Sequence, residues 1–124
     1  MCGPTALMFA SYNGHLDVIR YLVDNGAQLD RKNKEGRTAL MFAASGPFPD
    51  VVQYLLEQGA DPNRTDMAEG WSPLMYAAAE GNTEVVKILL SHGADPELKD
   101  KDGDTAADFA QNNGHTEIAK LLKK

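Results

Sequence analysis

One short pattern recurs four times along this 124-residue chain, and its spacing constrains the fold more than any other feature. In each copy a hydroxyl residue leads into a short run of small and large apolar residues. The copies occupy residues 5–10, 38–43, 72–77 and 105–110, so they begin at a nearly constant interval. A unit as short as this interval cannot bury its own apolar face, and successive units must therefore stack into an elongated solenoid.

The third unit shows most clearly how one repeat is built. Ser72 is suited to cap a helix and Pro73 to occupy its first turn, so a short helix is predicted over residues 74–79. A second helix is predicted over residues 84–91, capped by Asn82 or Thr83, because its apolar residues form a wide stripe. Gly93 then supplies a left-handed end to that helix, and a polar, turn-rich arm follows.

The other units follow the same plan, with Thr5, Thr38 and Thr105 as the first-helix caps. We predict one repeat domain over residues 1–124, with repeats at approximately 1–35, 36–69, 70–102 and 103–124. The expected fold is all-α, a solenoid of helix-turn-helix units joined by β-hairpin-like loops.

The glycine-containing motifs between the helices resemble those of a known family. Gly-x-Thr/Ser followed by an apolar run starts at Gly36, Gly70 and Gly103, and Leu-Leu-x-x-Gly-Ala-Asp occurs at residues 55–61 and 89–95. With these motifs the chain resembles the ankyrin-repeat family over essentially all of its length. Tetratricopeptide repeats, the nearest alternative by period, lack the Gly-Ala-Asp punctuation.

Three departures from the family pattern leave alternatives open. Met8, Met41, Met75 and Asp108 stand where the family motif has histidine, and the methionines either fill the core or form an adaptable binding stripe. The turn at 45–50 holds Phe48 between two prolines, as an unusual turn or as a partner contact. The loop between the second and third repeats has one additional residue within 64–69.

The two ends of the chain differ in polarity. The fourth repeat is polar, with Lys120, Lys123 and Lys124 on its last helix, as a capping repeat requires. The first repeat is apolar, like an internal one, and lacks a leading hairpin arm. We expect either that the sequence begins inside a longer array or that its first repeat associates with another chain.

Composition and motifs exclude several classes of function. A net charge of −6 argues against nucleic-acid binding, and the single cysteine, Cys2, excludes an internal disulfide and a cysteine-rich metal cluster. No apolar run is long enough for a membrane helix and no signal peptide is apparent, so a cytoplasmic or nuclear location is expected. His15, His92 and His115 lie at separate turns without metal-ligand spacing. Residues 100–104 match a calcium loop poorly, and no catalytic motif, metal or cofactor is predicted.

The resemblance implies that a protein partner binds along a concave face formed by the loop tips and the first helices. Trp71 stands out there, because aromatic anchors often dominate interface energies, although it could equally fold over its own or a neighbouring hairpin. The predicted contact residues are Lys34, Glu35, Arg37, Met67, Glu69, Trp71, Lys101, Asp102 and Asp104 on the loops, and Tyr12, Ser45, Glu80, Asn112 and Asn113 at the helix ends.

The leading functional hypothesis is thus a non-enzymatic protein–protein interaction module. A second hypothesis is an architectural ankyrin segment of a larger multidomain protein whose activity lies elsewhere. A metal-binding or enzymatic domain is disfavoured by the missing site. Self-association through the uncapped first repeat is a further alternative for the partner.

Overall fold

A computed structural model describes residues 6–123, so the predicted cap Thr5 and the terminal Lys124 lie outside the described residues. Within that range the chain forms helices and no strands. The helices are α1 (Ala6–Tyr12), α2 (Leu16–Asp24), α3 (Ala39–Ala44), α4 (Pro49–Glu57), α5 (Pro73–Glu80), α6 (Thr83–Ser91), α7 (Ala106–Asn112) and α8 (Thr116–Leu122).

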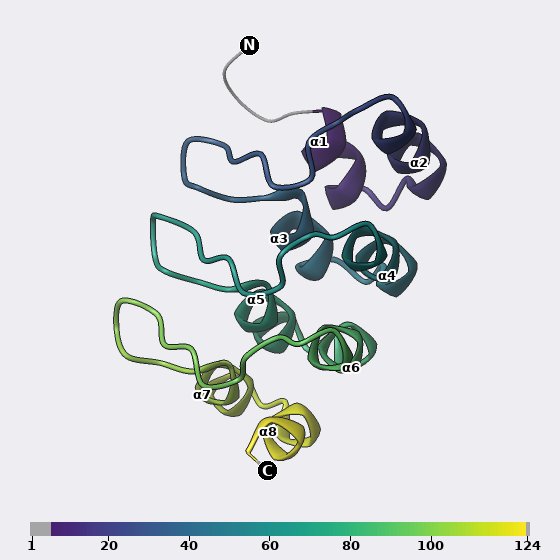
Figure 1. Ribbon diagram of the computed structural model, residues 1–124. Coiled ribbons are helices and arrows are strands. Elements are labelled where there is room, and N and C mark those ends of the chain that lie inside the picture. The colour runs from purple at the N-terminus through teal and green to yellow at the C-terminus, as the bar shows by residue number, and fades with distance from the viewer. Residues whose placement is uncertain (1–5, 124) are drawn as a thin grey trace.

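The helices stack in pairs, one pair above the next (Figure 1). The first helices α1, α3, α5 and α7 form one column, and the second helices α2, α4, α6 and α8 form the other. Between successive pairs a long loop projects beyond the column of first helices. The structure therefore confirms the predicted all-α solenoid of helix pairs.

One continuous apolar core runs through the stack. Leu40 and Leu74 of the first helices and Val52 and Val86 of the second helices are almost completely buried. Met8, Met41 and Met75 are buried in the same way, so the core-filling interpretation of the methionines is confirmed. Neighbouring repeats therefore bury each other's apolar faces, which accounts for the stability of such short helices.

Each projecting loop is closed by one acidic or amide side chain. We call these loops the first finger (residues 27–38), the second finger (60–72) and the third finger (94–105). Asn33, Asp66 and Asp100 occupy equivalent places in them, and each accepts hydrogen bonds from backbone N–H groups a short way further along the chain. The fingers are also linked to one another, because Met67 N donates to Glu35 O at 2.7 Å and Lys101 N to Glu69 O at 3.0 Å. These bonds hold three fingers without strands in a fixed row.

The turns between paired helices are linked across repeats by one residue in each turn. The Phe48 ring packs directly over Gly14, where an added Cβ would lie 2.5 Å from the ring. In the next repeat Asn82 donates to Ala44 O at 3.1 Å and to Gly46 O at 3.0 Å. His115 follows, with Nε2 3.2 Å from Ala79 O. Phe48 therefore has a structural role in the unusual turn.

The predicted helix caps are only partly correct. The Ser72 and Thr105 side chains accept hydrogen bonds from the third residues of their helices, Met75 N and Asp108 N. Thr38 and Asn82 stand at cap positions without a side-chain cap bond. For Asn82 the reason is that its amide binds the carbonyl groups of the preceding repeat instead.

Candidate protein-binding surface

The exposed side chains of the three fingers and of the first-helix ends form a surface that we call the finger face. On the fingers, Lys34, Glu35, Met67, Glu69, Lys101 and Asp102 are exposed. At the helix ends, Tyr12, Glu80, Asn112 and Asn113 are exposed. The remaining predicted contact residues, Arg37, Ser45, Trp71 and Asp104, are only partly exposed.

Asp66 is the polar centre of the second finger, and sequence reasoning missed it. It is 3% exposed. Its Oδ1 accepts hydrogen bonds from Glu69 N at 2.8 Å, Gly70 N at 2.9 Å and Trp71 N at 3.3 Å, and its Oδ2 accepts one from the Tyr76 hydroxyl at 2.5 Å. Burial alone would raise the pKa of this carboxyl, but these hydrogen bonds outweigh burial and lower it. Asp66 therefore stays ionised and fixes the base of the finger.

Arg37 extends the same network to the first finger. Its Nε donates to the Tyr76 hydroxyl at 3.0 Å and lies 3.9 Å from Asp66 Oδ2. Burial and the adjacent Asp66 carboxylate raise the pKa of Tyr76 well above its usual range, so the hydroxyl remains a donor. The guanidinium is therefore committed in part to holding two repeats together.

Trp71 bridges the third and fourth repeats. Its Nε1 donates to Asp100 Oδ2 at 3.1 Å, and its ring makes edge-to-face contacts with Tyr76 and Phe109, both at 5.4 Å between centroids. Of the two sequence alternatives, these contacts favour folding over the neighbouring hairpin. A role of Trp71 in partner binding stays a prediction.

We expect Trp71→Ala to lower the free energy of unfolding by about 2 kcal/mol, because two aromatic contacts and one hydrogen bond are lost. Trp71→Phe keeps most of the ring contacts and should lose about half as much. Urea unfolding followed by circular dichroism measures both changes. If Trp71→Ala and the unmodified protein were equally stable, the contacts of Trp71 would contribute nothing to the free energy of unfolding.

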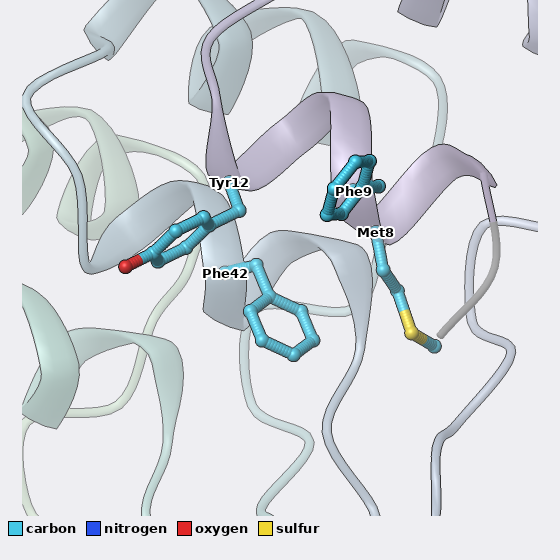
Figure 2. A pocket seen from close by; sticks show the side chains of 4 residues that line it. All are labelled: Met8, Phe9, Tyr12 and Phe42. Carbon is cyan, nitrogen blue, oxygen red and sulfur yellow. The ribbon is translucent and has the colours of Figure 1, made fainter. Parts of the chain in front are cut away.

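A pocket opens on the first helices at the other end of the stack. Met8, Phe9 and Tyr12 of α1 and Phe42 of α3 line it (Figure 2). The volume of the pocket is about 190 Å³. Of these residues only Tyr12 was predicted to contact a partner. The sequence does contain a signal for the pocket, because one repeat position is aromatic in all four units. The residues at that position are Phe9, Phe42, Tyr76 and Phe109.

The charge of the fingers changes sign along the stack. The first finger has four basic and two acidic residues, the second has one basic and three acidic, and the third has two basic and five acidic. In the third finger, partial burial and then the carboxylates of Asp100, Asp108 and Asp102 raise the pKa of Asp104. The finger face is thus basic at one end and acidic at the other.

The described residues offer little for metal chemistry. Between residues 6 and 123, no group of three or more His, Cys, Asp or Glu side chains is placed to hold a metal ion. His92 Nε2 lies 3.2 Å from Gln53 Nε2, and His115 binds the carbonyl of Ala79, so both histidines have structural neighbours. None of the helices in the described range is long and apolar enough to cross a membrane.

Stacked helix pairs with a row of projecting fingers define a solenoid repeat protein. The family model for ankyrin repeats (three copies) matches residues 2–66 and 65–124. The chain therefore belongs to the ankyrin-repeat family, as its motifs predict. No curated protein gives a significant match to it.

Proposed function

We propose that this protein is a non-enzymatic interaction module, which binds a protein partner on the finger face. The observation that carries this proposal is the contrast between a fixed finger backbone and exposed tip side chains. Asn33, Asp66 and Asp100 and the bonds between fingers hold the backbone, while the side chains of Lys34, Glu35 and Asp102 project from the tips. A rigid scaffold with exposed side chains binds at a low cost in conformational entropy.

The contact residues divide into two groups under this proposal. The exposed residues Lys34, Glu35, Met67, Glu69, Lys101, Asp102, Tyr12, Glu80, Asn112 and Asn113 contact the partner directly. Arg37, Trp71, Asp104 and Ser45 contribute mainly by shaping the finger bases and helix ends. The opposite charges of the first and third fingers give the partner one preferred orientation and make its association rate depend on salt. We place the protein in the cytoplasm or nucleus, in line with its single cysteine.

Site-specific photo-crosslinking tests the proposal. A benzophenone amino acid replaces Lys34 at a finger tip in one variant and Lys87, which is exposed on the second-helix side, in a matched control. Irradiation in an extract of the source cells should give discrete adducts from position 34 and few from position 87. Adducts from both positions alike, or from neither, would contradict binding on the finger face. If the chain is instead an architectural segment of a larger protein, neither position should give adducts.

A second candidate, self-association through the first repeat, rests on a comparison between repeats. Val18 and Tyr21 of α2 are 46% and 67% exposed, whereas Val51 and Val85, which occupy the Val18 position in later repeats, are buried. The same crosslinker at Tyr21 distinguishes this candidate, because it should then yield an adduct of twice the chain mass with purified protein alone.

A further inference from the structure

In the part of the chain that the structure describes, the pocket between the first two repeats is lined by aromatic side chains. Phe9 and Tyr12, which are 69% and 57% exposed, project from α1, and Phe42 projects from α3 (Figure 2). Tyr12 meets Phe42 edge-to-face at 6.2 Å between centroids. Among residues 6–123, the lining is made of aromatic rings and the Met8 side chain, so the pocket suits an apolar group.

Elsewhere in the chain an aromatic ring is held between residues that share the repeat position of Phe9 and Phe42. Phe9, Phe42, Tyr76 and Phe109 form one row, because they share a repeat position. Trp71 lies between Tyr76 and Phe109, touching both rings edge-to-face, and its indole N–H donates to the Asp100 carboxylate. The pocket lies between Phe9 and Phe42, the other end pair of that row. Trp71 is thus an example in this chain of an aromatic ring held between two neighbouring members of the row.

The row also faces the finger bases. Tyr76 binds Arg37 of the first finger and Asp66 of the second, so its ring lies on the finger side of the first helices. Phe9 and Phe42 share its repeat position and therefore point to the same side. The pocket therefore opens on the finger side of the first helices.

The finger next to the pocket sets the charge of a segment that binds there. The first finger leads directly into α3, which carries Phe42, and it is the basic finger of the three. Arg31, Lys32 and Lys34 are exposed on it. Carboxylates in a segment that passes this finger are attracted to these cations, whereas basic residues in the segment are repelled.

We propose that this pocket binds an aromatic side chain of a partner protein segment in which acidic residues flank that aromatic. The inference rests on the proposed function and deepens it, because it names the chemistry of the partner. Tyr12, Phe9 and Phe42 hold the ring, and the first finger holds the carboxylates. The acidic third finger disfavours the reverse orientation of the segment.

Selection of displayed peptides tests the inference. A phage library of short random peptides is selected against the full chain, and enriched peptides are synthesised and titrated by fluorescence polarisation. Enriched sequences should share Trp, Phe or Tyr with Asp or Glu nearby. Tyr12→Ser and Phe9→Ser should each weaken their binding about tenfold, since both remove exposed contact surface.

Two matched variants serve as controls. Lys87→Ser removes an exposed side chain from α6, on the second-helix side, and should leave the affinity unchanged. Lys34→Glu should weaken binding about threefold and reduce its salt dependence, whereas Lys120→Glu on α8 should do neither. Circular dichroism confirms that each variant is folded.

The alternative outcomes are distinguishable. Enriched peptides that lack an aromatic residue, or that carry basic flanks, overturn the inference. Peptides that Tyr12→Ser leaves unaffected but Asp102→Lys weakens overturn it too, while the proposed function stands. If no peptide is enriched and position 34 gives no crosslink, both fail. Concentration-dependent dimerisation that Tyr12→Ser abolishes, measured by sedimentation velocity, would assign the pocket to a second copy and overturn the inference.

Discussion

Replacing Asp66 with alanine should lower the free energy of unfolding by about 3 kcal/mol, although Asp66 lies in a loop. Its side chain is inaccessible to solvent and is the acceptor for the Tyr76 hydroxyl and for three backbone N–H groups. Alanine leaves these donors without their acceptor and removes the negative charge beside Arg37. Urea denaturation followed by circular dichroism measures the loss.

Two variants show whether the loss comes from this network. Asp24→Ala removes a carboxylate from the exposed end of α2 and should change the stability by less than about 0.5 kcal/mol. Asp66→Asn keeps one oxygen for the backbone N–H groups but loses the charge. Its loss in free energy of unfolding should therefore lie between those of Asp24→Ala and Asp66→Ala. Similar losses for Asp24→Ala and Asp66→Ala would contradict the proposed role of Asp66.

The pH dependence of the same variant has a definite sign. The pKa of Asp66 is lower in the folded chain than its ordinary value of 3.8, so the unfolded chain binds the proton first as the pH falls. The ionised Asp66 carboxylate therefore makes its full contribution to the free energy of unfolding above pH 3.8. That contribution is lost as the pH falls through the lower pKa of Asp66 in the folded chain. Accordingly, the stability difference between the unmodified protein and Asp66→Ala should be constant near neutral pH and should narrow below about pH 4.

The fold was predictable because its signals are local and repeated. A hydroxyl before an apolar run marks the first helices, and an aliphatic stripe marks the second helices. The hydrogen bonds that the Asn82 amide donates were not predictable in this way, because the acceptors, the carbonyl groups of Ala44 and Gly46, lie in the preceding repeat. Phe48 was ambiguous for the same reason, since its contact with Gly14 spans two turns of different repeats.

The site was less predictable than the fold. Sequence reasoning identified the fingers by their polarity, but it overlooked that Asn33, Asp66 and Asp100 close the fingers, although these three residues recur with the same period as the helices. Trp71 was noticed because it is unusual, yet its orientation depends on Phe109 in the next repeat. The pocket was overlooked because an aromatic residue within a helix resembles a core residue, and only exposure separates Phe9 from Phe109.

The second large effect concerns the column of second helices. Leu55 in α4 is completely buried between neighbouring repeats, so Leu55→Ala should lower the free energy of unfolding by about 3 kcal/mol. The loss combines the transfer free energy of the removed groups with the cost of the cavity they leave. Because each repeat is stabilised by its neighbours, the helical signal of the whole stack should be lost in one transition at a lower urea concentration.

A matched variant in the first repeat provides the control. Leu22 holds in α2 the repeat position that Leu55 holds in α4, but it is only half-buried. Leu22→Ala should therefore lower the free energy of unfolding by about 1 kcal/mol, since Leu22 buries less apolar surface than Leu55 does. A loss as large as that of Leu55→Ala would show that the first repeat is packed as tightly as an internal one, contrary to the exposure of Val18 and Tyr21. A dependence of the Leu22→Ala loss on protein concentration would instead indicate that a second chain covers this face.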